Sequence, residues 1–555
     1  MLLDLTDERA EDPGLAGAKA SWLARGLRAG LPVLPGRVVP ATLSKEPMQR
    51  GCDVMETRGS GGARLAISQT PLSEELEAEV VKAAQELGET LVVRSSSILE
   101  GGGEWSGAFT SYLDLSAEET PVGVRGCWAS AFTVHTLERY EATGIEPGSA
   151  PMAVLIQPAL TPDFGGVARL VDGEVSVIGV VGSPVPLVQG WDPGLHALVT
   201  TDGVVKGEAA VATIGEPILA SVAEALLVAD RRIGANTCEW AVVGENVTLL
   251  QLGRVEPRVK ATLSVPEAFA RPEIGEVARL IRRYPGPLGE ELVLPWAVAN
   301  TLGFLEDAEP ADLDPQDAFL GAVEQSRALV AEVWGGRKAD SLDEASAAVR
   351  GLRGDEPLAA VRALESLRPA DPERGHSILS LLARVRVAMV EMGAVGRPDQ
   401  AWHLTTREIG DVLRAGRAKE LRSRIGFDRW EPFDAAVVVA QGKEVQGVAA
   451  ASGIGVGRLC FVDDPTTAQG FRPRDVVVGL RPTPKLAPLL WDASALITTG
   501  GGPAAHLFES ARALAIPAIT SVDLEGILGV DLAAASGRFS IVVDGNEGRA
   551  WTMPW

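Results

Sequence analysis

A histidine follows a run of glycines near the C-terminal end of the chain, where residues 498–506 read TTGGGPAAH. The apolar run before the glycines predicts a strand at 495–497, and residues 507–514 have the composition of a helix. Free backbone N–H groups at a helix N-terminus favour anions, and glycines let the backbone approach a bound group closely. His506 could therefore carry a phosphoryl group on a ring nitrogen. On these residues alone, a strand-turn-helix that simply begins with a histidine is an equally good interpretation.

A second candidate anion site lies in the N-terminal half. A helix predicted over residues 73–87 leads into a strand at 90–94, and this strand delivers Arg94 to the polar loop SSSILEGGG at 95–103. Guanidinium groups offer fixed donors, and glycine-rich backbone can expose N–H groups as an anion nest. The pattern suits phosphate binding, but a flexible surface loop remains the alternative.

Two oxygen-bearing side chains are spaced to meet in a hairpin. Residues 238–243 and 247–251 alternate as strands around a turn at 244–246. In that hairpin Glu239 and Gln251 lie roughly opposite each other. Mg²⁺ takes few protein oxygens and completes its shell with phosphate and water, so the pair could bind it. The alternative is an exposed hairpin end with a solvated glutamate.

The elements that must position these residues imply several domains. A chain of 555 residues exceeds one domain, and 46% hydrophobic content suffices for packed cores. A helix at 15–23 and a strand after a Pro-Gly turn open the chain. Helical periodicity dominates 318–333, 342–352, 357–367 and 378–392. Strands are predicted at 475–478 and 539–544, with a turn at 545–548.

Net charge and cysteine spacing limit the partners and the compartment that the protein is expected to have. A net charge of −23 disfavours nucleic-acid partners, and no basic amphipathic stretch favours a membrane surface. No apolar run reaches the roughly 18 residues of a membrane span. The four cysteines form no CxxC pair and are interpreted as reduced thiols of a cytoplasmic protein. The acidic N-terminus does not have the pattern of a signal peptide.

The C-terminal stretch resembles the phosphohistidine, or swivelling, domain of the phosphoenolpyruvate synthase and pyruvate phosphate dikinase superfamily. Its pattern is Thr-x-x-Gly-Gly-x-x-Ser-His with later Ala-Arg and Ile-Pro-Ala. The matching positions are Thr498, Gly501, Gly502, His506, Ala511, Arg512, Ile516, Pro517 and Ala518. The family's serine is replaced here by Ala505, which removes a hydroxyl that could orient the imidazole. The resemblance implies that His506 is the phosphoryl carrier.

The N-terminal part resembles the same superfamily's nucleotide-binding module. The Gly-x-Lys and Gly-Leu-Pro-Val blocks near residues 17–36 imply that Lys19 contacts nucleotide phosphates. Val-Arg-Ser-Ser matches at Arg94, which the resemblance makes both a phosphate-binding and a catalytic residue. Trp-Ser-Gly ending at Gly107 stands for the family's Phe-Ala-Gly, and Ser111 falls at its threonine. The loop is two residues shorter than usual, and only Glu100 represents its acidic pair.

Three further positions follow from this resemblance. Gln157 ends a buried strand that passes the adenine in the family. Glu239 and Gln251 match Ile-Glu-Trp-Ala and the glutamine of Gln-x-Arg-Pro, which bind the metal. Arg254 is the counterpart of the arginine that contacts the transferred phosphate, although it comes one residue late.

Together these features predict an α/β multidomain fold in three parts. An ATP-grasp-like ATP-binding domain occupies 1–260, a helical middle domain that holds or links to the acceptor occupies 261–436, and a swivelling phosphohistidine domain occupies 437–555. The layout is similar to that of rifampin phosphotransferase-like enzymes, without the pyruvate barrel. In the middle domain the pocket or the core could include His376, Met389, Met392, Trp402 and His403.

The resemblance implies an ATP- and Mg²⁺-dependent phosphotransferase. The β-phosphoryl group of ATP would pass through His506 to a small-molecule hydroxyl or enol, leaving AMP and phosphate. The acceptor could be an antibiotic or a biosynthetic intermediate. Two alternatives remain: the phosphocarrier half of a split dikinase whose partner protein holds the acceptor site, and a non-catalytic nucleotide-binding protein. A homo-oligomer is also possible.

Overall fold

The computed structural model describes two large parts of the chain and short stretches between them. The described residues are 1–200, 202–255, 265, 267–284, 286–292, 382–383, 385–391, 393–396, 398–405, 407–409, 431–463 and 470–555. The predicted helices at 318–333, 342–352 and 357–367 lie outside these residues, as do His376 and Met392. Met389, Trp402 and Leu404 are buried.

The chain opens with an antiparallel five-stranded sheet in the order β1-β2-β5-β3-β4. These strands are β1 (Leu3–Asp4), β2 (Arg37–Val39), β3 (Leu91–Ser97), β4 (Ser111–Leu115) and β5 (Met152–Pro158). The run MAVLIQ of β5 is buried throughout because this strand lies in the middle of the sheet. The sheet is accompanied by α1 (Pro13–Arg28), α2 (Lys45–Gln69), α3 (Glu74–Leu87), α4 (Thr120–Ala129) and α5 (Val134–Thr143).

The polar segment after Arg94 is more regular than the sequence predicts. Residues 95–97 extend β3, and Ile98–Gly102 forms a 3-10 helix. Ser97 and Glu100 cap this helix reciprocally, side chain to backbone. The flexible-loop alternative is therefore wrong for residues 95–102, because local capping and pairing with β5 satisfy the backbone.

A second antiparallel sheet has the order β11-β10-β6-β7-β8-β9. Its strands are β6 (Phe164–Val171), β7 (Glu174–Val181), β8 (Leu195–Val199), β9 (Val205–Lys206), β10 (Thr237–Val243) and β11 (Asn246–Gly253). Its helices are α6 (Val185–Val188), α7 (Glu208–Thr213) and α8 (Glu216–Ile233). The predicted hairpin is confirmed, with Glu239 directly opposite Gln251.

Helix α1 joins the two N-terminal sheets through one apolar core, which also includes side chains of α8, β5 and β10. The helix is kinked at Gly17, which has φ +72°. A Cβ at Gly17 would lie 1.9 Å from the Ser96 carbonyl oxygen, so only glycine lets α1 approach β3 this closely. The kink places the following turn of α1 against the end of β3.

The C-terminal domain contains an eight-stranded sheet in the order β12-β19-β18-β14-β15-β16-β17-β13. Its strands are β12 (Lys443–Gln446), β13 (Val448–Ala451), β14 (Ile454–Phe461), β15 (Val476–Gly479), β16 (Ala495–Thr498), β17 (Ala518–Thr520), β18 (Phe539–Asp544) and β19 (Arg549–Pro554). Strands β14 to β17 run parallel. The helical elements are α17 (Glu431–Gln441), the 3-10 helix Pro484–Trp491, α18 (His506–Leu514), α19 (Leu524–Leu528) and α20 (Leu532–Ala535).

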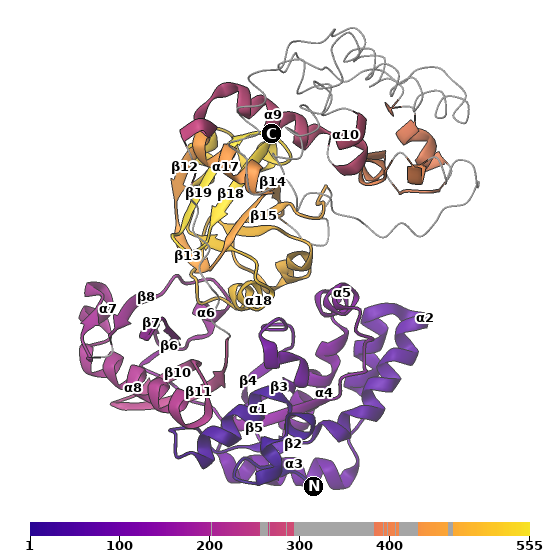
Figure 1. The fold of residues 1–555 in the computed structure, drawn as a ribbon. Helices are drawn as coiled ribbons and strands as arrows, with labels where there is room; N and C mark the ends of the chain where they lie inside the picture. The colour runs from indigo at the N-terminus through magenta and orange to yellow at the C-terminus, as the bar shows by residue number, and fades with distance from the viewer. Residues whose placement is uncertain are drawn as a thin grey trace, which may run out of the picture.

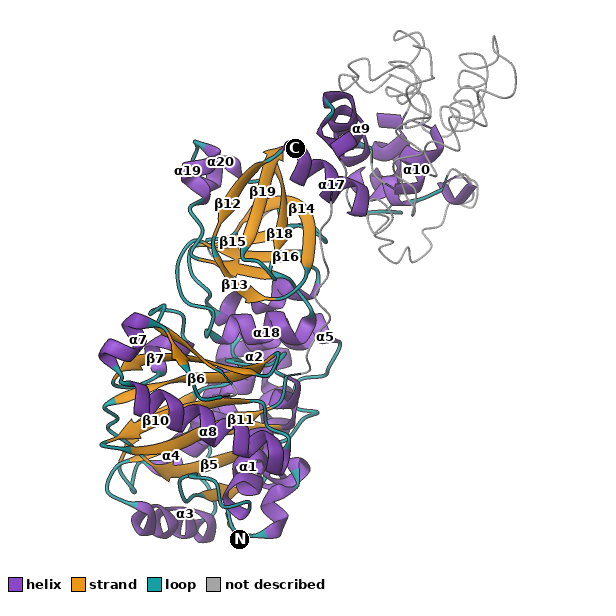
Figure 2. Cartoon of the chain, turned by 60° about the vertical axis from the view of Figure 1, so that its left-hand side comes forward, coloured by secondary structure: helices purple, strands orange, loops and turns teal. Residues whose placement is uncertain are grey.

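Helix α18 lies on the face of this domain that meets the N-terminal part (Figures 1 and 2). The Pro484–Trp491 helix packs beside α5. Ala504 joins a small apolar cluster with Val167, Ile178 and Leu187 of the second sheet and α6. The two large parts therefore meet exactly where the glycine-histidine stretch begins α18.

The remaining described elements adjoin the far end of the C-terminal domain (Figure 2). They are α9 (Pro272–Arg283), α10 (Gly286–Leu292) and the 3-10 helices Glu267–Ala270 and Pro398–His403. A buried ion pair between Arg282 and Asp434, 2.6 Å apart, fixes α9 to α17. Across the residues that the structure describes, each helix is too short or too polar to cross a membrane.

Candidate functional site

The glycine-histidine stretch adopts the predicted strand-turn-helix. Strand β16 ends at Thr498, and α18 begins at His506 with Ala505 as its N-cap residue. Gly501 has φ +91°, and a Cβ there would lie 2.9 Å from the Gly190 carbonyl oxygen and closer still to Pro482. The glycine turn is thus shaped by close contact with the N-terminal part.

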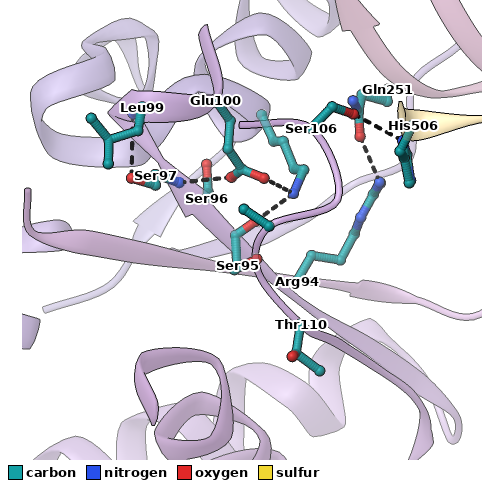
Figure 3. A network of polar contacts seen from close by, with 12 residues as sticks. Arg94, Ser95, Ser96, Ser97, Leu99, Glu100, Ser106, Thr110, Gln251 and His506 are labelled. Atoms are coloured by element: carbon teal, nitrogen blue, oxygen red, sulfur yellow. Dashed lines mark hydrogen bonds and ion pairs between the residues drawn. The ribbon is translucent and has the colours of Figure 1, made fainter. Parts of the chain in front are cut away.

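The imidazole of His506 faces a loop of the N-terminal domain (Figure 3). Its Nδ1 lies 2.9 Å from the Ser106 hydroxyl and 3.2 Å from Oε2 of Glu509, one turn further along α18. A Cβ on Gly107, which has φ +65°, would approach the His506 Cβ to 3.1 Å. Gly107 therefore gives the histidine room to dock.

Opposing forces act on the proton affinity of His506. Burial lowers the pKa of the imidazole, but the hydrogen bond and charge of Glu509 and the charge of Glu239 raise it. Lys19 opposes them, and the net direction is upward. Nδ1 faces both Glu509 and the Ser106 hydroxyl, so these two groups bear on which ring nitrogen carries the proton of the neutral imidazole.

Glu509 is itself held across the domain interface. Its Oε1 lies 3.5 Å from the Arg169 guanidinium of β6, and its Oε2 accepts a hydrogen bond from Ser106. Burial raises the pKa of Glu509, but the hydrogen bond to His506 and the charges of His506 and Arg169 hold that pKa well below its usual range. The carboxylate is therefore ionised beside the imidazole.

Arg94 connects the two N-terminal sheets at the same place. Its guanidinium donates to the Leu250 carbonyl at 2.6 Å and to Oε1 of Gln251 at 2.9 Å. It also lies 3.6 Å from Oε2 of Glu239. The structure thus brings together Arg94, Glu239 and Gln251, which the sequence predicts for phosphate and metal binding; Figure 3 shows Arg94 and Gln251.

Glu239 and Gln251 have the donor atoms that a small hard cation prefers. In this structure the Arg94 guanidinium lies against an oxygen of each side chain. A carboxylate and an amide oxygen, with water and phosphate, suit Mg²⁺. Among the described residues no group of three or more His, Cys, Asp and Glu side chains is arranged for a metal.

Lys19 is paired rather than solvated. Its ammonium forms a short ion pair with Glu100 and donates to the Ser95 carbonyl at 3.2 Å. Both side chains are mostly buried, at 14% and 4% exposed. Lys19 therefore lies at the end of β3, near Arg94, and its charge reaches His506.

The other predicted binding residues are Ser111, Gln157 and Arg254. Ser111 is exposed at the start of β4, opposite Arg94 in the sheet. Gln157 is buried, and its amide donates to the Leu34 carbonyl at 3.2 Å. The exposed Arg254 donates to the Gly234 carbonyl at 3.1 Å, at the end of α8.

Residues that the sequence reasoning missed fix the histidine domain in place. Arg139 of α5 donates to the Ser106 carbonyl and, across the interface, to the Pro484 carbonyl, each at 3.0 Å. Burial lowers the pKa of Arg139 to about 10. Ser510 of α18 donates to the Glu104 carbonyl at 3.2 Å.

One of the missed signals was visible in the sequence. His506 and Glu509 are spaced i, i+3 on a predicted helix, which places them on one face. Arg169 carried no such signal. Ser106 belongs to the Trp-Ser-Gly stretch, but its contact with His506 had no signal in the spacing, since both residues reach the site from the N-terminal domain, hundreds of residues away.

The class of protein follows from family comparison. Residues 14–193 match the family described as pyruvate phosphate dikinase, AMP/ATP-binding domain. Residues 471–548 match the PEP-utilising enzyme, mobile domain. The protein is thus a mixed α/β chain that combines an ATP-binding domain with the mobile domain that bears His506.

The curated relatives of the chain include a transferase, a probable phosphoenolpyruvate synthase and a phosphotransferase. The chain is 27% identical to the prodigiosin synthesizing transferase PigC of Serratia marcescens over 56% of its own length and 33% of PigC. It is 22% identical to a probable phosphoenolpyruvate synthase of Staphylothermus marinus over 98% of its length and 56% of that protein. A 105-residue match to the uncharacterized phosphotransferase YvkC of Bacillus subtilis is 35% identical, over 19% of this chain and 12% of YvkC.

In both matched domains the chain is similar to the phosphoenolpyruvate synthase and pyruvate phosphate dikinase superfamily. It spans about half or less of the length of these relatives.

Proposed function

We propose that the protein is an ATP-dependent phosphotransferase that works through phosphorylated His506. The observation that carries the proposal is the position of the imidazole. It lies in the interface with the ATP-binding domain, where the charges of Lys19 and Glu239 both act on it. A phosphoryl donor bound to that domain would meet the histidine directly.

The chemistry assigned to this chain is nucleophilic transfer. Nε2 attacks phosphorus, the N–P bond forms, and the P–O bond to the leaving group breaks. The positive charge that develops on the ring faces the ionised Glu509. Lys19 and Arg94 would neutralise the phosphates, and positioning with charge compensation is what phosphoryl transfer chiefly needs.

Glu239 and Gln251 would hold Mg²⁺, which when bound neutralises phosphate charge and orients the donor. We further propose Gly107, Ser111 and Gln157 as nucleotide-site residues, and Arg254 as a phosphate contact that would have to turn away from α8. By family resemblance the β-phosphoryl group reaches the acceptor, and AMP and phosphate are released.

The acceptor is proposed to be a small-molecule hydroxyl or enol. Similarity to a transferase named for prodigiosin synthesis favours a biosynthetic intermediate among such acceptors. The family's mobile domain supports a swivelling movement that carries the phosphoryl group away from the ATP-binding domain.

The chain spans only part of the length of its relatives, which favours a second candidate function. In this second candidate, the chain is the phosphocarrier half of a split dikinase, and another protein holds the acceptor site.

The test is incubation of the full chain with Mg²⁺ and ATP labelled at the β-phosphorus. Label on the wild-type protein that is lost in His506→Ala supports the proposal, and His196→Ala, which changes an exposed histidine, should keep the label. Label that leaves only after a second protein is added supports the split system. Absence of label on the wild type would contradict catalysis and leave a nucleotide-binding role.

A further inference from the structure

Ser106 lies in a firmly held loop of the N-terminal domain. The preceding Trp105 is buried and packs on Phe109 and Tyr140, with ring centroids 5.8 and 4.8 Å away. Arg139 holds the Ser106 carbonyl at 3.0 Å. The serine side chain is therefore presented to the interface by a rigid support and not by a mobile tip.

The hydroxyl of Ser106 has two partners in the other domain. It donates a short hydrogen bond to Oε2 of Glu509, and its oxygen lies 2.9 Å from Nδ1 of His506. One hydroxyl proton cannot serve both partners, so the Ser106 oxygen accepts from Nδ1–H. The same Nδ1–H also points to Glu509 at 3.2 Å.

The histidine's own domain does not supply this hydroxyl at the start of α18. Ala505, the N-cap residue, has no side-chain oxygen and makes no capping hydrogen bond through its side chain. From its own helix, His506 has Glu509 as the Nδ1 partner. The second partner arrives only when the two domains are docked.

We infer that Ser106 is a positioning residue that acts across the domain interface to fix the Nδ1–H tautomer of His506. It thereby leaves the lone pair on Nε2 in the docked arrangement. When the histidine domain leaves, the hydroxyl stays behind and Glu509 travels with the ring. The imidazole is thus best prepared as a nucleophile at the place where the phosphoryl donor binds. The catalytic consequence rests on the proposed function, but the tautomer does not.

The direct test is nitrogen NMR of the full chain labelled with ¹⁵N-histidine. The chain has five histidines, and the spectrum of His506→Ala assigns the signal of His506. We expect the wild type to show Nδ1–H and an unprotonated Nε2 above the imidazole pKa. Ser106→Ala should give a mixture of tautomers, whereas Ser106→Thr, which keeps the hydroxyl, should keep the wild-type form.

A matched control separates this effect from simple loss of docking. Ser510→Ala removes another hydroxyl bond across the same interface, to the Glu104 carbonyl, without touching the imidazole. It should leave the tautomer unchanged. The inference is overturned if the wild type carries the proton on Nε2, or if Ser106→Ala leaves the tautomer as it was.

The rate of His506 phosphorylation gives a second test of the role of Ser106. With β-labelled ATP in a single turnover, Ser106→Ala should slow label transfer to His506 about tenfold or more, the scale of one lost hydrogen bond to a charged network. A wild type that takes no label would defeat the proposed function, while the NMR result still judges Ser106. Equal rates in wild type and Ser106→Ala would defeat this inference and leave the proposed function standing.

Discussion

At the scale of single residues, Glu509 governs how His506 behaves. An ionised carboxylate one helical turn away raises the pKa of the ring, against the effect of burial. A phosphoryl acceptor needs a neutral imidazole, since the imidazolium has no lone pair. The same residue that orients the nucleophile therefore also restricts it at low pH.

Removing this charge should shift the pH dependence of histidine phosphorylation. In the wild type the rate should rise with pH through a pKa above the ordinary histidine value. Glu509→Gln keeps the size of the side chain but loses the charge, so the pKa of His506 should fall and the rising limb should move to lower pH. Near pH 6 the variant should reach a several-fold larger fraction of its own plateau rate.

The measurement is initial label transfer from β-labelled ATP between pH 5 and 9, with Glu525→Gln on α19 as a control. A rising limb at the same pH in wild type and Glu509→Gln would contradict this account. The linkage has a matching sign for stability: a raised folded-state pKa stabilises the folded chain most below the ordinary histidine pKa, and this contribution fades as pH rises through the raised value.

At the scale of elements, the kink in α1 positions the phosphate-binding side of the N-terminal domain. Gly17 allows the helix backbone to touch the end of β3, where the Ala20 N–H donates to the Ser96 hydroxyl at 3.1 Å. The next turn then brings Lys19 to Glu100 and the Ser95 carbonyl. A straight helix would hold Lys19 elsewhere.

Gly17→Ala should therefore destabilise the N-terminal domain and weaken nucleotide binding. A Cβ at this position combines an unfavourable positive φ with an impossible approach to the Ser96 oxygen, and we expect a loss of at least about 2 kcal/mol in the free energy of unfolding. Urea denaturation and ATP titration would measure the two effects.

Gly61→Ala is the matched control, because a Cβ at Gly61 meets nothing within 4 Å and this helical position favours alanine. It should stabilise α2 by up to about 1 kcal/mol. Equal effects of the two substitutions would contradict the role assigned to the kink.

At the scale of the whole molecule, the two large parts meet through a few specific polar contacts and a small apolar cluster. Arg139 and Arg169 of the N-terminal part reach the Pro484 carbonyl and Glu509, and Ala504 packs into the cluster beside α6. Such an interface would suit the proposed movement of the histidine domain, because few contacts have to break.

Arg139→Met should shift the molecule toward undocked arrangements. The substitution keeps much of the apolar stem but loses the hydrogen bonds to the Pro484 and Ser106 carbonyls. Small-angle X-ray scattering should show a larger radius of gyration than in the wild type. Arg58→Met, at an exposed position of α2, is the control and should leave the radius of gyration unchanged. An unchanged radius in Arg139→Met would mean that these contacts do not hold the domains together.

The local elements around the candidate site could be predicted from the amino-acid sequence. Glycine breaks, apolar runs and turn residues act over a few positions, so the strand-turn-helix at His506 and the pairing of Glu239 with Gln251 could be predicted. The resemblance then identified the superfamily, which the matched domains confirm. The boundaries between the three predicted domains stay a prediction.

Which side chains surround the imidazole became visible only in the folded molecule. Ser106 and Arg169 come from the N-terminal domain, and their approach depends on how the surfaces of the two large parts fit. The tertiary structure also turned Arg254 toward α8 and paired Lys19 with Glu100. Contacts between distant segments follow from packing geometry, which leaves no periodic or spacing signal along the chain.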